Sequence, residues 1–135
     1  MTQIDHLGNA VKSLTDAKQF YEKLGLEVMP EEVEESEKVR VATVPVGENR
    51  IELHEPAVLD STIARFLEKR GQGLHHVALR VTNLASTGER LNASGTRLIN
   101  EEIKVGAGEH RYIFVHPARA GGVLLELVED AGQNV

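Results

Sequence analysis

The sequence contains no cysteine and no long apolar segment. Without cysteine the chain cannot carry a disulfide framework, a zinc ribbon or a thiol nucleophile, and the absence fits a cytoplasmic protein. No apolar run approaches the roughly 18 residues that a membrane-spanning helix needs, and the N-terminus lacks the pattern of a signal peptide. The sequence therefore predicts a cytoplasmic protein without a membrane partner.

Basic side chains are also scarce, with 15 Lys and Arg against 21 Asp and Glu and a formal net charge of −6. This balance argues against nucleic acid as a partner, because nucleic-acid binding demands a basic face. The Walker loop, the Rossmann fingerprint and the nucleophile elbow are all missing, so serine-dependent acyl transfer has no support. The six histidines and the carboxylates are the only strong metal ligands that the sequence offers.

The chain is an imperfect internal repeat. Ile4–Val11 resembles Leu74–Val81, and the offset from His6 to His76 is 76 − 6 = 70. The end of each half also matches, and there the offset from Glu52 to Glu126 is 126 − 52 = 74. The four additional positions predict a longer hairpin in the second half, within 106–109 or 119–122.

Each half has the periodicity of a strand, a helix and three further strands. Helices are expected at 13–24 and 84–94, each ended by a glycine, and a linker helix at 60–71 is capped by Asp60 or Ser61. The expected strands are 3–11, 26–34, 38–46, 50–55, 74–82, 96–104, 110–116 and 122–129.

A length of 135 residues, 41% hydrophobic and 27% charged, fits one globular domain over 1–135. We expect an α+β fold of two tandem βαβββ modules, at about 3–56 and about 73–130, with the linker helix between them. Side by side, two such modules would form a curved, eight-stranded, half-open barrel around a metal cleft.

The repeat pairs the ionisable residues. His6 and His76 are equivalent in the first strand of each half, and Glu52 and Glu126 are equivalent in the last. Packing about a pseudo-twofold axis would bring the four side chains together. Two imidazoles and two carboxylates suit a divalent Co, Mn, Zn, Ni or Fe ion better than Mg or Ca, which prefer oxygen ligands alone.

An alternative is that strict alternation turns Glu52 and Glu126 to solvent on edge strands, with the histidines merely packed. Matched His and Glu positions in both halves favour the metal site. His54 would share a face with Glu52, whereas His75 would point to the face opposite His76. The remaining two histidines are expected in a hairpin and at a strand end: His110 and His116.

The chain resembles the vicinal oxygen chelate superfamily (glyoxalase, bleomycin resistance and dioxygenase proteins), and within it the methylmalonyl-CoA epimerase family. The first of the shared segments is common across the superfamily, and several of the others are more particular to the epimerases. The segments are Ile4–Leu7, Phe20–Leu26, Ile51–Pro56, Asp60–Leu67, Gly73–Ala78, His116–Pro117 and Gly122–Leu127.

The resemblance implies an enzyme of propionate metabolism that interconverts the C2 epimers of methylmalonyl-CoA, an acyl-CoA substrate, through an enolate. It assigns the metal ligands to His6, Glu52, His76 and Glu126. A metal would act there as a Lewis acid, Glu126 as one general base and Glu52 as the second candidate. By the same resemblance a homodimer is expected.

One departure concerns a glutamate that some epimerases carry in the third strand of the first half. The matching position is assigned to Arg40, and arginine cannot act as a base. If it faces the cleft, Arg40 would instead hold the free carboxylate of the substrate. Cations for the CoA phosphates are expected among Lys69, Arg70, Lys104, Arg111 and Arg119.

Three alternatives share the expected fold. The first is a glyoxalase I-like isomerase (lactoylglutathione lyase), which acts on a glutathione hemithioacetal. The second is a non-catalytic protein that sequesters a small molecule, and the four retained ligands argue against it. Ring-cleaving dioxygenases rank third, because they use two histidines and one glutamate.

Overall fold

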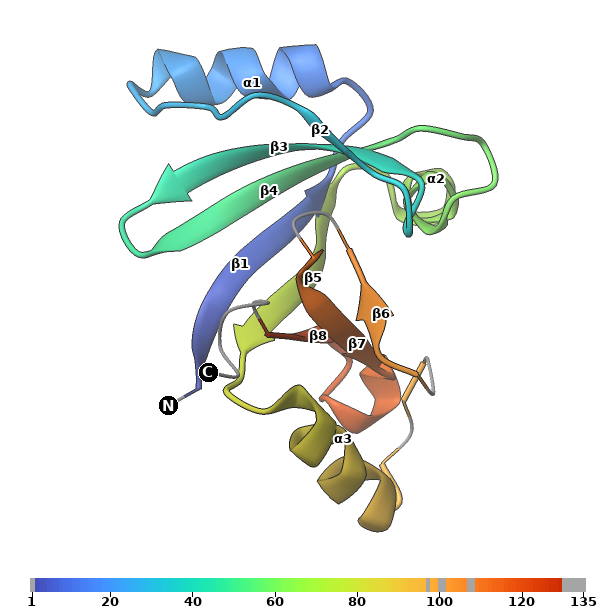
Figure 1. The fold of residues 1–135 in the computed structure, drawn as a ribbon. Helices are drawn as coiled ribbons and strands as arrows, with labels where there is room; N and C mark the ends of the chain where they lie inside the picture. Colours follow the sequence, from blue (N-terminus) through green and yellow to red (C-terminus); the bar gives the residue numbers. More distant parts are fainter. Residues whose placement is uncertain (1, 97, 100–101, 107–108, 130–135) are drawn as a thin grey trace. The chain divides into compact units, whose positions relative to one another are not determined.

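The computed structural model describes residues 2–96, 98–99, 102–106 and 109–129 (Figure 1). Three α-helices lie in these residues: α1 (Leu14–Lys23), α2 (Thr62–Arg70) and α3 (Leu84–Ala93). A short 3-10 helix, η2, covers Pro117–Arg119. The strands are β1 (Gln3–Ala10), β2 (Glu32–Glu34), β3 (Val39–Val46), β4 (Asn49–Pro56), β5 (Gly73–Arg80), β6 (Lys104–Val105), β7 (Arg111–Val115) and β8 (Leu125–Glu129).

The eight strands form a mixed sheet in the order β2-β3-β4-β1-β5-β8-β7-β6. The chain divides into two compact units, which we name the N-terminal unit (His6–His75) and the C-terminal unit (Met1–Asp5 with His76–Val135). The α+β fold class and the two βαβββ modules are thus confirmed. The assignment of 1–135 to one domain stays a prediction.

The two units pair their strands in the same way. In the N-terminal unit β1 and β4 are parallel, while β3 is antiparallel to β2 and β4. In the C-terminal unit β5 and β8 are parallel, while β7 is antiparallel to β6 and β8. Side chains at paired positions share a face of the sheet, so this register decides which groups meet.

The helices α1 and α3 begin and end in the way that the sequence predicts. The side chains of Ser13 and Asn83 accept hydrogen bonds from backbone N–H groups of the first turn, at 3.2 and 3.0 Å. Gly25 and Gly95 follow the helices with φ of 86° and 81°, a left-handed conformation that costs other residues energy. Ser61 caps α2 in the same manner as Ser13 caps α1.

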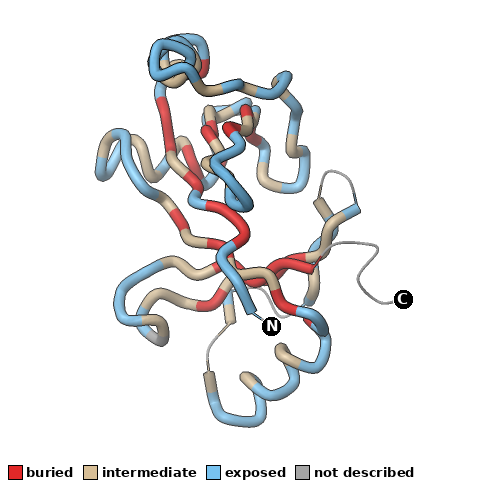
Figure 2. The backbone as a smooth tube through the Cα atoms, turned by 90° about the vertical axis from the view of Figure 1, so that its left-hand side faces the viewer, coloured by how far each residue is buried: buried red, intermediate tan, exposed pale blue. Residues whose placement is uncertain are grey.

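Each unit has two small apolar cores, and the buried stretches of Figure 2 lie mainly along the strands. One core packs α1 through Leu14 against one face of β3 and β4, and its counterpart packs α3 through Leu84 against β7 and β8. Burying either leucine contributes about 2 kcal/mol. In the N-terminal unit α2 covers part of the other face, where Ile63 packs on Ala10 and Val39.

A buried glutamate supports the start of each of these two helices. Glu55 Oε1 accepts a hydrogen bond from the backbone N–H of Leu14, and Glu129 Oε1 accepts one from that of Leu84, both at 3.1 Å. Each glutamate also pairs with the arginine opposite it on the neighbouring strand, Glu55 with Arg40 and Glu129 with Arg111.

Two expected strands are shorter than predicted. Residues 26–31 are not part of β2, because Leu26 and Val28 pack against the α1 core without joining a ladder. Residues 96–104 likewise contribute only the start of β6 and an isolated bridge from Leu98 to Val115. Within the described residues, no helix is long and apolar enough to cross a membrane.

The register also locates the additional positions of the second half. Arg40 and Arg111 are equivalent at an offset of 111 − 40 = 71, whereas Glu52 and Glu126 are equivalent at 126 − 52 = 74. Three of the four additional positions therefore lie between β7 and β8, in the connection that contains η2. Of the two hairpins expected to be longer, the one containing 119–122 is confirmed as the main site, while 107 and 108 lie outside the described residues.

Candidate functional site

In the N-terminal unit, the parallel pairing of β1 and β4 brings His6 beside Glu52. Gly8 lies opposite Glu52 in the register, so the side chain of His6, two residues earlier, points to the same face. His6 Nε2 lies 3.3 Å from Glu52 Oε1. The His6 side chain is 5% exposed and that of Glu52 is 16% exposed, so neither turns to solvent.

Two further side chains of β4 contact the same carboxylate. His54 Nε2 lies 3.1 Å from Glu52 Oε1, and the Arg50 guanidinium donates to Oε2 at 3.3 Å. Burial alone would raise the pKa of Glu52. The hydrogen bond with His54 and the charges of His6, His54 and Arg50 outweigh burial and hold this pKa well below its usual range. Glu52 therefore remains ionised.

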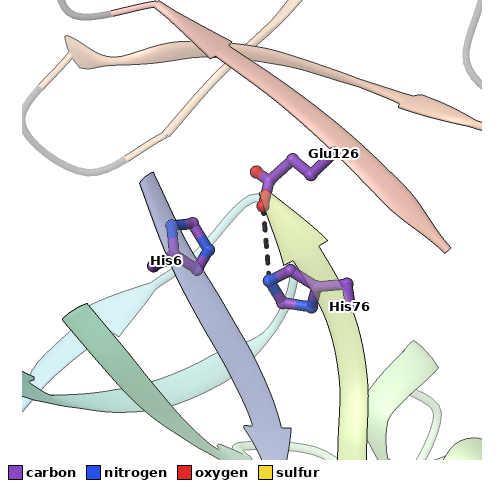
Figure 3. A group of neighbouring side chains, drawn as sticks. All are labelled: His6, His76 and Glu126. Carbon is purple, nitrogen blue, oxygen red and sulfur yellow. Dashed lines mark ion pairs between the residues drawn. The ribbon is translucent and has the colours of Figure 1, made fainter. Parts of the chain in front are cut away.

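In the C-terminal unit, His76 and Glu126 form the equivalent pair. His76 Nε2 lies 3.3 Å from Glu126 Oε1 (Figure 3). Both residues are buried, His76 at 4% and Glu126 at 5% relative exposure. The alternative that Glu126 faces solvent is therefore wrong.

The walls beside the two glutamates differ. Thr43 lies opposite Glu52 on β3, whereas Phe114 lies opposite Glu126 on β7 and meets the His76 ring edge-on at 5.9 Å. The position two residues after each glutamate also differs, since 54 + 74 = 128 matches His54 with the buried Val128. The first carboxylate thus lies among polar and charged groups, and the second lies beside an aromatic ring.

Arg40 does not share the face of Glu52. It lies opposite Glu55 in the β3–β4 register, one residue away from the position of Val41, which lies opposite His54. Its guanidinium is 2.6 Å from Glu31 and 3.8 Å from Glu55. The condition under which Arg40 would hold a substrate carboxylate is therefore not met, and on the site face of β3 the described side chains nearest Glu52 and His54 are Thr43 and Val41.

The remaining histidines have structural contacts. His75 meets the Phe66 ring edge-on at 4.9 Å, on the face opposite His76, as predicted. His110 stacks on Tyr112, and His116 accepts a hydrogen bond from the Ala118 N–H at the start of η2.

The cations expected for the CoA phosphates fall into two groups. Arg111 is engaged by Glu129, so it serves the fold. Lys69 and Arg70, at the end of α2, and Lys104 on β6 are exposed. The side chain of Arg119 lies outside the described part of the chain.

The donor chemistry fits a divalent transition metal. Buried imidazoles and carboxylates that could hold such an ion occur in both units, as His6, Glu52 and His54 in one and as His76 and Glu126 in the other. Ligands at about 2.1 Å from one ion lie about 3.0 to 3.4 Å apart. The observed Nε2–Oε1 separations of 3.1 and 3.3 Å lie in this range.

Beyond the expected ligands, Arg50 and His54 make the main contacts of Glu52. Strand alternation predicts His54 on this face, whereas Arg50 was overlooked in the sequence. A signal for Arg50 was present, because residues two apart in a strand share a face.

Comparison with known proteins identifies relatives over the whole chain. Residues 5–114 match the model of the Glyoxalase/Bleomycin resistance protein/Dioxygenase superfamily. The uncharacterized protein YqjC of Bacillus subtilis is 41% identical over 135 residues, covering 99% of this chain and 96% of the relative. The mitochondrial methylmalonyl-CoA epimerase of Bos taurus is 38% identical over 127 residues, covering 93% of this chain and 73% of the relative.

A solved structure agrees with these relatives. A methylmalonyl-CoA epimerase in complex with methylmalonyl-CoA and NH4+ has a TM-score of 0.91 at 33% identity, covering 98% of this chain and 96% of the other. The resemblance predicted from the sequence motifs is confirmed. The chain belongs to the glyoxalase/bleomycin resistance protein/dioxygenase superfamily, and within it to the methylmalonyl-CoA epimerase family.

Proposed function

We propose that this chain is a metal-dependent methylmalonyl-CoA epimerase. The observation that carries the proposal is the pair of matched, buried His–Glu contacts, His6 with Glu52 and His76 with Glu126. The relatives support the substrate, because the bovine relative is named a methylmalonyl-CoA epimerase and the solved one holds methylmalonyl-CoA. By its family the chain is an isomerase of the epimerase class.

In this proposal His6, Glu52, His76 and Glu126 hold one divalent ion between them. Two imidazoles and two carboxylates favour Co, Mn, Zn, Ni or Fe. When bound, such an ion would act as a Lewis acid toward the thioester and carboxylate oxygens of the substrate. The buried position of the four side chains supports this role, because unbalanced buried carboxylates would be costly.

Glu126 is the proposed general base. The C2 proton lies between a thioester carbonyl and a carboxylate, so its removal leaves a delocalised enolate. The proton passes to the Glu126 carboxylate, and return of a proton to the opposite face of C2 gives the other epimer. Phe114, opposite Glu126 in the register, helps to keep water from this carboxylate.

Glu52 is the candidate for proton transfer on the second face. Its surroundings favour the ligand role, because Arg50 and His54 stabilise the ionised carboxylate and so weaken it as a base. We therefore assign Glu52 to metal binding first and to proton transfer second. The expected homodimer and cytoplasmic location stay predictions.

The test is deuterium incorporation at C2 of methylmalonyl-CoA in deuterium oxide, with and without a chelator. The expected result is rapid incorporation that the chelator abolishes and that Co²⁺ restores. Incorporation unaffected by chelation would refute the metal dependence. Isomerisation of a glutathione hemithioacetal without exchange on methylmalonyl-CoA would favour the glyoxalase I-like alternative.

A further inference from the structure

His54 lies beside the proposed ligands of the N-terminal unit and has no assigned role. Its side chain is 10% exposed, and its Nε2 lies 3.1 Å from Glu52 Oε1. His6 Nε2 lies 3.3 Å from the same oxygen. One carboxylate oxygen of the N-terminal unit thus has two imidazole nitrogens at the spacing of neighbouring metal ligands.

The strand register gives the three side chains a common face. Gly8 lies opposite Glu52 and Ala10 lies opposite His54, on the parallel strand β1 that also carries His6. Neither of these opposite residues has a side chain larger than a methyl group. The neighbouring strand therefore adds no bulky side chain at the two positions directly beside Glu52 and His54.

The internal repeat does not account for this histidine. The equivalent position in the C-terminal unit is Val128, which is buried in an apolar cluster with Ala78 and Tyr112. A buried imidazole at position 54 is therefore a feature of the N-terminal unit alone. An apolar side chain would satisfy the packing there, as Val128 does in its own unit.

We propose that His54 is an additional ligand of the metal held by His6 and Glu52. The N-terminal unit then supplies a His-Glu-His donor set from β1 and β4. This inference rests on the metal of the proposed function and does not depend on the substrate. A third imidazole would favour Co, Ni and Zn over Mn, because nitrogen ligands bind the later metals more strongly.

The experiment compares Co²⁺ binding by the chelator-treated full chain and by two variants, His54→Gln and His54→Leu. Glutamine keeps a hydrogen-bond donor for Glu52, whereas leucine removes it, so the pair separates ligation from orientation of Glu52. His110→Gln is the matched control, because His110 stacks on Tyr112 away from this set. Affinity is measured by competition with a chromophoric chelator, and coordinated imidazoles are counted from the paramagnetically shifted N–H signals in the proton NMR spectrum.

The expected result is that both His54 variants lose one shifted imidazole signal and bind Co²⁺ about 100-fold more weakly, while His110→Gln matches the wild type. An unchanged number of signals in His54→Gln, or affinity restored by glutamine, would overturn the inference. Absence of Co²⁺ binding by the wild type would overturn it as well. Loss of the signal in a protein that fails to exchange the C2 proton would uphold the inference and refute the proposed function.

Discussion

Glu129 occupies in the C-terminal unit the position that Glu55 has in the N-terminal unit, at the same offset that relates Glu126 to Glu52. Each accepts the N–H of the first residue of a helix and pairs with the arginine opposite it. The environments differ, because Glu129 is fully buried and Glu55 is only partly buried. The same device therefore has a different energetic weight in the two units.

Glu129→Ala is expected to lower the free energy of unfolding by about 3 kcal/mol, since it strands Arg111 and the Leu84 N–H beside a buried gap. Glu55→Ala is expected to cost about 1 kcal/mol, because its partners reach water. Urea denaturation followed by circular dichroism measures both. Equal losses would show that burial of this carboxylate does not set its contribution.

Arg40→Ala is expected to leave epimerisation intact, with kcat/KM changed by less than about threefold. The reason is that Arg40 faces away from Glu52 and pairs with Glu31 and Glu55. Steady-state assays with methylmalonyl-CoA check this expectation. A loss of 100-fold or more, roughly the cost of a lost substrate contact, would return Arg40 to the site.

His76→Ala is expected to remove bound metal and activity together while leaving the fold largely intact. His76 belongs to the proposed ligand set and packs edge-on against Phe114, so its truncation opens a cavity that costs about 2 kcal/mol of stability. Metal content by mass spectrometry, activity and the far-ultraviolet dichroism spectrum give the three measurements. A metal-replete, fully active variant would contradict the assignment.

Glu126→Gln is expected to slow deuterium exchange at C2 by about 100-fold to 10,000-fold, since an amide cannot accept the proton. The substitution keeps the shape of the side chain beside His76. The matched comparison is Glu52→Gln, which we expect to weaken metal binding more than exchange at saturating metal. Exchange at the wild-type rate in Glu126→Gln would assign the base elsewhere.

His75 is expected to make stability fall in acid. Burial, aided by the charge of His54, lowers the pKa of His75 from 6.5 to about 4, so below pH 6.5 the unfolded chain binds a proton that the folded chain does not. Stability should decrease as the pH falls from 6.5 to 4, by at most ~3 kcal/mol. His75→Phe keeps a ring against Phe66 and should flatten this dependence in urea titrations with chelator present. An unchanged slope would mean that another group titrates.

The repeat made much of the fold predictable. Strands β1 and β5 and helices α1 and α3 are equivalent at one constant offset at both of their ends, as the matched motifs indicated. The limits of β2 and β6 were less predictable, because Leu26 and Val28 are apolar for packing under α1 and not for strand pairing. Hydrophobic pattern reports burial, and it reports hydrogen-bonded pairing only indirectly.

The His–Glu contacts within each unit also followed from the repeat, whereas their surroundings did not. The face of Arg40 depends on the register of β3 against β4, and a shift of one residue reverses it. The helix-capping role of Glu55 and Glu129 was overlooked, although their spacing equals that of Glu52 and Glu126. A matched glutamate can serve a backbone as readily as a metal, and sequence spacing alone does not distinguish the two uses.

The unequal walls of the two matched carboxylates have a consequence for how such a chain acquires specialised chemistry. A duplicated module provides two copies of one acidic side chain, and each copy can change its neighbours without disturbing the other. Here Arg50 and His54 commit one copy to permanent charge, while Phe114 leaves the second beside a hydrocarbon surface. Duplication thus allows division of labour between an anchor and a reactive group within a single polypeptide.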